Sequence, residues 1–357
     1  MVKPRPTSDA PPFMDLYHDL ISGSCHNGGS ARTPLHGDVD GGCQRGEHKL
    51  PVIDLGDLTR AGEETRRACV AAIAKASSEW GFFQVVNHGF SRELLEEMRR
   101  VQVRLFERTF DKKAGCGLLG SYYTWGTPTA TSAHQVSWSE RFHFPLAKIL
   151  AGDEVEDPGN EKLSYSREVM GRFSGAVWEL ARELVVVLTE NLQGHQAGRP
   201  STPAEICSGK TCFLRLNRYP RCPVSAKVMG IVSHTDSDFL TIVFQDQVGG
   251  LQLRNDDGEW VAVKPNPDAL VVNIGDLFQA WSNDVYKSVE HRVVAGGETE
   301  RYSIAYFMCP AEDAVVGSCG GGPSTYRRFT FEEYRRQVAE DVKSNGQKVG
   351  LSNFLLP

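Results

Sequence analysis

The chain has 357 residues, a net charge of −6 and no long block of Lys or Arg, which argues against a nucleic-acid partner. Its 40% hydrophobic and 24% charged residues are ordinary for a globular protein with a large core. No stretch approaches the roughly 18 apolar residues that span a bilayer, and the N-terminus lacks the apolar core of a secretory signal. We therefore expect a soluble protein without a membrane partner, located in the cytoplasm, with the nucleus as the alternative. Its oligomeric state stays open.

Nine cysteines, an odd number, are spread along the chain, and no Cys-x-x-Cys pair occurs. This pattern disfavours a zinc site or a disulfide framework and indicates a reducing compartment.

The N-terminal part predicts a flexible segment followed by a helix-rich region. Residues 1–48 form the flexible segment, with a short amphipathic helix at 12–21 and a Gly-rich insertion at 22–48. The helix-rich region covers residues 49–200. Hydrophobic spacing predicts strands at 50–58 and 81–89, and helices at 62–79, 91–108 and 166–193.

After residue 210 the pattern changes to short β-rich runs separated by Gly, Pro, Asn and Asp. Regularly spaced short strands with turn signals predict a double-sheet jelly roll. A C-terminal helix should start after Thr330, because Thr330 and Glu333 form a capping box and Phe329 with Tyr334 a hydrophobic staple. We therefore expect an α+β fold with a double-stranded β-helix (jelly-roll) core, flanked by N-terminal and C-terminal helices. The jelly roll with its helix would cover 201–345, leaving a tail at 346–357.

The first candidate site is the stretch "SHTDSDFLTIVFQD", in which His234 and Asp236 stand just before an apolar run. Such a pair proves little alone, since His36 and Asp38 have the same spacing in a Gly-rich segment. The third partner is His291 in "SVEHRVV", 55 positions after Asp236. Two imidazoles and one carboxylate suit the facial triad of non-haem Fe(II) enzymes, which leaves positions open for substrate and oxygen. A structural zinc site would favour thiolates.

The second candidate site is a carboxylate clamp. Arg301 and Ser303 are two residues apart in a predicted strand and so share one face. A guanidinium beside a hydroxyl suits a carboxylate held away from the metal. In "LNRYP", Asn217 and Tyr219 alternate in the same way, and the Tyr219 phenol could complete the clamp.

These motifs, with "NRYPRC" and "EWGFFQVVNHG", resemble the plant 2-oxoglutarate- and Fe(II)-dependent dioxygenases over roughly residues 50–345. Within that family the barrel motifs are similar to those of gibberellin oxidases, and residues 123–146 resemble the gibberellin 2-oxidase branch that acts on twenty-carbon precursors. Two features depart from the family pattern. Arg221 stands where proline is usual, and the 22–48 insertion is uncommon.

The resemblance implies a hydroxylase with a defined set of roles. His234, Asp236 and His291 would be the catalytic metal ligands for Fe(II). Arg301, Ser303, Tyr219 and Asn217 would bind 2-oxoglutarate. Oxygen would be the second co-substrate, with ascorbate in support, and the reaction would be 2β-hydroxylation that inactivates a gibberellin.

The substrate pocket needs an apolar wall and a few polar groups. Aromatic residues before the barrel and on its strands are the candidates. They are Tyr123, Trp125, Trp138, Phe142, Phe239 and Phe307.

Two alternatives stay open at this point. Another oxidase of the family, a gibberellin 20- or 3-oxidase or a flavonoid oxidase, would share every metal and co-substrate residue. A non-catalytic hormone-binding module on a degenerate dioxygenase fold should have lost a ligand or the clamp, whereas all these positions are intact.

Overall fold

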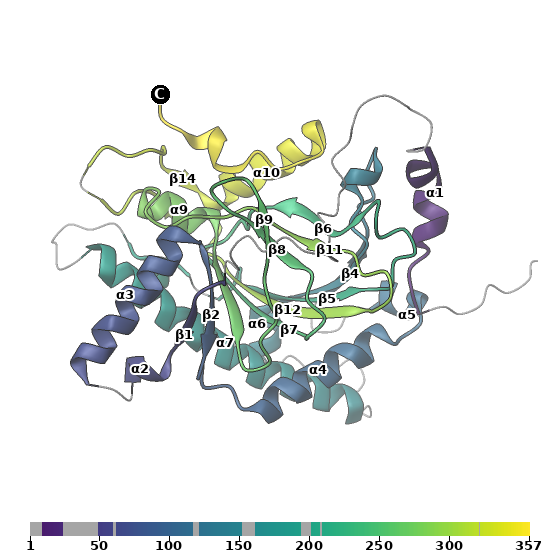
Figure 1. Ribbon diagram of the computed structural model, residues 1–357, viewed down its shortest axis with the longest axis horizontal. Helices are drawn as coiled ribbons and strands as arrows, with labels where there is room; N and C mark the ends of the chain where they lie inside the picture. The colour runs from purple at the N-terminus through teal and green to yellow at the C-terminus, as the bar shows by residue number, and fades with distance from the viewer. Residues whose placement is uncertain are drawn as a thin grey trace, which may run out of the picture.

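The computed structural model describes residues 9–23, 49–59, 62–116, 121–151, 161–193, 201–207, 209–320 and 322–357. The predicted insertion at 22–48 lies almost wholly outside them. No helix among the described residues is both long and apolar enough to cross a membrane. Two β-sheets form the centre of the molecule, with helices around them (Figure 1).

The larger sheet has eight strands, in the order β1-β2-β10-β7-β12-β5-β4-β3. Its strands come from both halves of the chain. They are β1 (Val52–Asp54), β2 (Phe82–Val86), β3 (Tyr122–Trp125), β4 (Glu140–Pro145), β5 (Phe213–Tyr219), β7 (Leu240–Gln245), β10 (Leu270–Ile274) and β12 (Arg301–Met308). Strands from before residue 200 therefore extend the sheet of the jelly roll on both sides. The division at residues 200 and 201 stays a prediction, and it does not separate two sheets.

The smaller sheet has four strands, in the order β6-β11-β8-β9. They are β6 (Met229–His234), β8 (Leu251–Arg254), β9 (Trp260–Ala262) and β11 (His291–Val294). Two opposed sheets, antiparallel except for the parallel β1–β2 pair, confirm the jelly-roll expectation. A short ribbon of β13 (Val315–Val316) and β14 (Phe329–Thr330) completes the strands in the described part of the chain.

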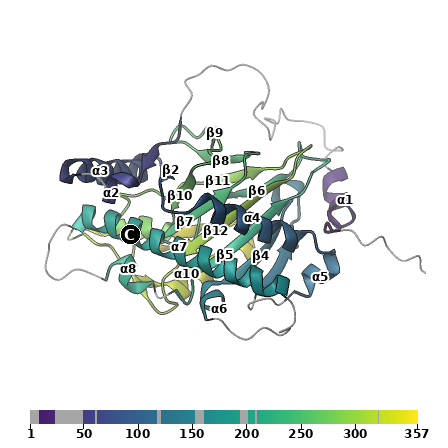
Figure 2. The same cartoon turned by 90° about the horizontal axis from the view of Figure 1, so that it is seen from below.

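The longer helices pack on opposite sides of the sheets. The helices α4 (Arg92–Phe106) and α7 (Glu161–Gln193) lie together below the large sheet, and Figure 2 shows them from that side. Helix α10 (Phe331–Asn345) lies above it (Figure 1). Its predicted capping box between Thr330 and Glu333 is present, and the rings of Phe329 and Tyr334 are 5.7 Å apart.

The remaining helices are shorter or lie at the edges of the sheets. They are α1 (Phe13–Gly23), α2 (Gly56–Thr59), α3 (Glu63–Glu79), α5 (Phe110–Ala114), η2 (Ala133–Gln135), α6 (Leu146–Leu150), α8 (Pro203–Ile206), α9 (Asp276–Ser282) and η3 (Gly350–Phe354). The strand predicted at 50–58 is shorter, because Asp54 accepts a hydrogen bond from the Gly56 N–H and α2 begins there. The segment predicted as a tail packs on the body, where Phe354 is 1% exposed.

Candidate active site

The three predicted metal ligands lie at one end of the smaller sheet. His234 is the last residue of β6 and His291 the first of β11, and the two residues are paired across these antiparallel strands. His234 therefore ends a strand of its own, and the predicted apolar run follows it as β7. Asp236 follows in the connecting turn. The Nε2 atoms of His234 and His291 are 3.6 Å and 3.8 Å from Asp236 Oδ1.

Hydrogen bonds to backbone carbonyls fix the orientation of both imidazoles. Nδ1 of His234 is 2.9 Å from the Val232 carbonyl, and Nδ1 of His291 is 3.1 Å from the Val289 carbonyl. Both carbonyls require a proton on Nδ1, so each Nε2 keeps its lone pair toward Asp236. This tautomer is the one that a metal-bound histidine needs.

Asp236 is held so that one oxygen stays free. Its Oδ2 accepts hydrogen bonds from Thr241 Oγ1 (2.7 Å) and Asn273 Nδ2 (2.8 Å), while Oδ1 faces the two imidazoles. Burial by itself would raise the pKa of Asp236, but the two histidines and the two hydrogen bonds outweigh it and lower the pKa. Burial, followed by the neighbouring His291, lowers the pKa of His234 to about 4. A carboxylate and a neutral imidazole are the protonation states that bind a divalent metal.

The pKa of Asp238, two residues after Asp236, shifts in the opposite direction. Asp238 is 1% exposed, and burial together with the charge of Asp236 raises its pKa well above the usual value. The Thr241 hydroxyl lies 2.9 Å from Asp238 Oδ2 and has one proton to donate. That hydroxyl also lies 2.7 Å from Asp236 Oδ2 and so links Asp238 to the triad.

The triad groups lie within 4.8 Å of one another, and this is the group of His, Cys, Asp and Glu side chains that meets metal geometry in the described part of the chain. Two imidazoles and one carboxylate, each with a free ligand atom on one side, fit a non-haem Fe(II) site.

The predicted clamp residues also meet. Strands β5 and β12 place Tyr219 opposite Arg301 and Asn217 opposite Ser303. Asn217 donates to the Ser303 hydroxyl (3.3 Å), and the Tyr219 hydroxyl lies 3.5 Å from the same oxygen. The Arg301 guanidinium lies over the Tyr219 ring at 4.8 Å and donates to Gln245 Oε1 (2.8 Å).

Arg301 keeps unused donors in the interior. It is 4% exposed, yet its Nε and Nη1 have no hydrogen-bond partner among the described residues. A buried guanidinium with free donors is costly unless a ligand pairs with it. A carboxylate in this space would accept hydrogen bonds from these free donors. The clamp therefore fits one end of 2-oxoglutarate.

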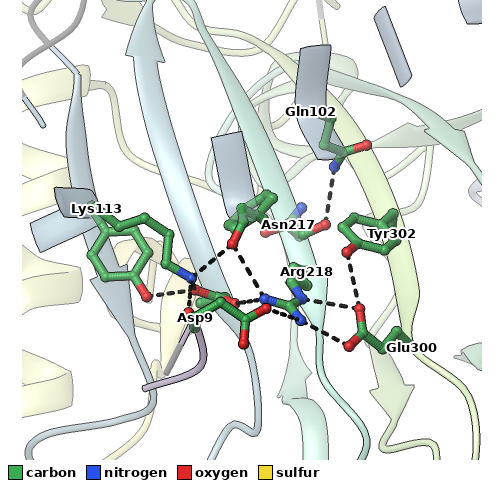
Figure 3. Close-up of polar contacts among 10 residues, drawn as sticks. Asp9, Gln102, Lys113, Asn217, Arg218, Glu300 and Tyr302 are labelled. Atoms are coloured by element: carbon green, nitrogen blue, oxygen red, sulfur yellow. Dashed lines mark hydrogen bonds and ion pairs between the residues drawn. The ribbon is translucent and has the colours of Figure 1, made fainter. Parts of the chain in front are cut away.

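Behind the clamp, Gln102 of α4 and residues on the other face of the clamp strands make polar contacts that the sequence analysis did not predict. Gln102 of α4 donates to the backbone carbonyls of Asn217 (3.0 Å) and Ser303 (2.7 Å), bridging the two clamp strands. Arg218 binds both oxygens of Glu300 at 2.8 Å and 3.0 Å, and Figure 3 shows the two groups facing each other. In the sequence, Arg218 and Tyr302 alternate with the clamp residues, and this alternation could have indicated polar contacts on the other face.

A cavity of about 1040 Å³ opens beside the triad. His234 and Asp236 line it, together with residues of β3, β4, β5, β12 and α10. It lies at the upper end of the usual range for small-molecule sites, about 300–1,000 Å³. None of the four clamp residues is part of this lining, so the space for a substrate is separate from the clamp.

The predicted substrate aromatics need correction. Phe307 lines the cavity, while the structure places the other five elsewhere. Phe142 and Phe239 are fully buried in the hydrophobic core, and the Tyr123 hydroxyl donates to Glu140. Trp125 and Trp138 pack around Phe13 of α1. On β3 and β4 it is the alternate residues, Tyr122 and His143, that line the cavity.

Comparison with known proteins agrees with this geometry. Residues 210–310 match the model of the 2OG-Fe(II) oxygenase superfamily, and residues 50–164 match the N-terminal model of non-haem dioxygenases in morphine synthesis. The chain is 53% identical to gibberellin 2-beta-dioxygenase 6 of Oryza sativa subsp. japonica, covering 96% of this chain and 95% of that protein. It is 48% identical to gibberellin 2-beta-dioxygenase 8 of Arabidopsis thaliana, covering 97% and 98%.

The chain is also similar to solved structures of dioxygenases. The crystal structure of JOX2 in complex with 2OG, Fe and JA superposes with a TM-score of 0.69 at 30% identity, covering 87% of this chain and 90% of that one. The rice dioxygenase for auxin oxidation has the same TM-score at 29% identity, covering 86% and 100%. The chain belongs to the 2OG-Fe(II) oxygenase superfamily. It is a dioxygenase that uses Fe(II) and 2-oxoglutarate.

Proposed function

We propose that this enzyme inactivates gibberellins by 2β-hydroxylation, with His234, Asp236 and His291 as the iron ligands. The observation that carries the chemistry is the convergence of two free Nε2 atoms and one free Oδ1 beside a cavity large enough for a polycyclic substrate. The substrate follows from the gibberellin 2-beta-dioxygenases that match at 41–53% identity over most of the chain.

The protein's own residues have three tasks in this mechanism. When bound, Fe(II) and 2-oxoglutarate supply the oxidising power, as O₂ converts 2-oxoglutarate to succinate and carbon dioxide and leaves one oxygen atom for the substrate. Arg301, Ser303, Tyr219 and Asn217 hold the distal carboxylate of 2-oxoglutarate. Thr241 and Asn273 keep Asp236 Oδ1 directed at the metal position. The cavity walls orient the substrate carbon and exclude water.

The finer proposal concerns the size class of the substrate. Twenty-carbon precursors carry a second free carboxylate, which a lactone masks in the nineteen-carbon forms. A site that pairs with this group rejects molecules lacking it, because its own polar groups then stay buried and unpaired. We expect the lactones to be turned over at least about tenfold less efficiently.

A substrate panel tests both levels. Twenty- and nineteen-carbon gibberellins are incubated separately with enzyme, Fe(II), 2-oxoglutarate and ascorbate, and the products are identified by mass spectrometry. Turnover of both groups at equal efficiency would remove the size preference alone. Oxidation at another gibberellin carbon, or of a flavonoid only, would replace the proposed reaction by that of another oxidase in the superfamily.

A further inference from the structure

Four aromatic rings form a continuous stack along one side of the active-site cavity. Tyr122 of β3 stacks on His143 of β4 at 4.4 Å, His143 on Phe213 of β5 at 4.1 Å, and Phe213 on Phe307 of β12 at 4.5 Å. All four residues line the cavity. Each ring comes from a neighbouring strand of the large sheet, so the surface is broad and held by the backbone ladder. We call these four residues the aromatic shelf.

Arg215 lies against this shelf. Its guanidinium is 5.4 Å from the centre of the Phe213 ring and 5.0 Å from that of Phe307, and the residue lines the cavity. Its Nε is buried with no hydrogen-bond partner among the described residues, none of whose carboxylates forms an ion pair with Arg215. A largely enclosed guanidinium without an anion is costly, and a ligand can remove that cost.

The other cationic side chains of the cavity are either paired with a carboxylate or exposed to solvent. Lys348 pairs with Asp276 at 2.6 Å and Arg335 with Glu312 at 2.5 Å, while Lys343 is exposed at the rim. The two acidic residues in the lining are Asp236, which faces His234 and His291, and Asp238, whose Oδ2 lies 2.9 Å from the Thr241 hydroxyl. Neither supplies a counter-ion for Arg215.

A second cation strengthens the case for an anionic ligand. Arg141 of β4 donates to the Thr124 hydroxyl at 2.9 Å and has no carboxylate partner in the described part of the chain. Burial, followed by the charge of Arg215, lowers the pKa of Arg141 to about 10. Two guanidiniums that repel each other on neighbouring strands, of which Arg215 lines the cavity, create a positive potential on this side of it.

Arg215 is distinct from the 2-oxoglutarate clamp. It shares the inward face of β5 with Asn217 and Tyr219, but it lies four positions from Tyr219, which is about 13 Å along a strand. Arg301, opposite Tyr219, therefore serves the co-substrate, and Arg215 faces the substrate space.

We propose that Arg215 and the aromatic shelf form the substrate subsite. The rings pack against the apolar face of a rigid polycyclic acid, and Arg215 binds one of its carboxylates in bidentate fashion. The proposal rests on the gibberellin assignment only for the identity of the acid. Since Arg141 adds a second positive charge, the subsite favours a substrate with two carboxylates over one in which a lactone masks the second.

The test compares an acid with its methyl ester in wild-type enzyme and in Arg215→Gln. Binding of a twenty-carbon gibberellin diacid and of its methyl esters is measured by calorimetry without oxygen, with Fe(II) and 2-oxoglutarate present. The wild type should bind the diacid roughly tenfold to a hundredfold more tightly than the matching ester, and Arg215→Gln should bind the two about equally. Arg100→Gln, on the exposed surface of α4, is the matched control for lost charge and should retain the preference.

The outcomes separate this proposal from the proposed function. An unchanged preference in Arg215→Gln would overturn the subsite, as would an equal loss of 2-oxoglutarate affinity, which would place Arg215 in the clamp. If the diacid binds through Arg215 but is not hydroxylated, the subsite stands and the proposed reaction fails. If no gibberellin binds, the comparison is repeated with other polycyclic resin-type acids and their esters, and lack of an Arg215-dependent preference there would also overturn the subsite.

Discussion

At the scale of single residues, the two histidines owe their role to their Nδ1 contacts as much as to their position. Replacing His234, Asp236 or His291 with Ala should reduce turnover by more than about a hundredfold, since loss of groups that merely orient metal ligands costs up to that much. Fe(II) content should fall in parallel, while the fold stays largely intact. Near wild-type 2-oxoglutarate consumption in any variant would remove that residue from the metal site. His134→Ala, an exposed histidine of η2, is the control.

Arg301 provides a second prediction at this scale. Arg301→Lys keeps the charge but loses the bidentate fork, so the KM for 2-oxoglutarate should rise while the KM for the gibberellin stays nearly constant. One lost charge-assisted hydrogen bond costs about 1.5–3 kcal/mol, equivalent to roughly a tenfold to hundredfold rise. Steady-state kinetics with each substrate varied in turn measure both constants. An unchanged 2-oxoglutarate dependence would exclude Arg301 from the clamp.

The sequence predicted the side chains of the metal triad, but it did not predict which aromatic residues line the cavity. His234, Asp236 and His291 could be found because metal geometry demands particular side chains on strands, and the spacing showed them. The cavity aromatics could not be chosen, because on a strand adjacent residues point to opposite faces. Tyr123 and Phe142 were predicted, whereas Tyr122 and His143 line the cavity. The alternation of "ERFHFP" carried the signal, but nothing in it tells which face is inside.

At the scale of elements, α4 stabilises the clamp from behind through Gln102, which is fully buried. Gln102→Leu keeps the volume but leaves the carbonyls of Asn217 and Ser303 without their donor. We expect a loss of about 1–3 kcal/mol in the free energy of unfolding and a higher KM for 2-oxoglutarate. Urea unfolding and steady-state kinetics measure the two effects.

Two comparisons make the Gln102 test specific. Gln347→Leu, at an exposed position after α10, removes a glutamine outside the clamp strands and should leave both quantities near wild type. A Gln102→Leu enzyme that is destabilised but keeps its 2-oxoglutarate dependence would show that Gln102 supports the fold and not the clamp. In the sequence, Gln102 follows the buried Val101 of α4, and no local pattern indicates its partners. Its role depends on a contact 201 residues away.

At the scale of the whole molecule, the C-terminal segment contacts the turn that carries Asp236. Lys348 pairs with Asp276 at 2.6 Å and donates to the Thr235 carbonyl (3.0 Å) and the Ser237 hydroxyl (2.9 Å). Because Lys348 and Asp276 come from distant segments and both are nearly enclosed, no local pattern in the sequence announced this pair. The tail predicted at 346–357 is therefore a structural part of the site's surroundings.

Breaking this pair should destabilise the enzyme. Lys348→Met leaves Asp276 buried with only hydroxyl donors, so the free energy of unfolding should fall by about 2–4 kcal/mol. The double variant with Asp276→Asn should recover part of that loss, because the uncompensated charge is gone. Chemical denaturation of the three proteins provides the comparison. A Lys348→Met protein as stable as wild type would show that the pair contributes nothing net.

In the proposed reaction, one oxygen atom of O₂ is placed on the 2β carbon of a gibberellin while 2-oxoglutarate is decarboxylated. The most direct measurement supplies ¹⁸O₂ and a twenty-carbon gibberellin carrying deuterium at the 2β position. We expect one ¹⁸O in the gibberellin product and one in succinate, with the 2β deuterium lost. Labelled succinate together with a product that keeps the 2β deuterium would contradict the proposed site of hydroxylation.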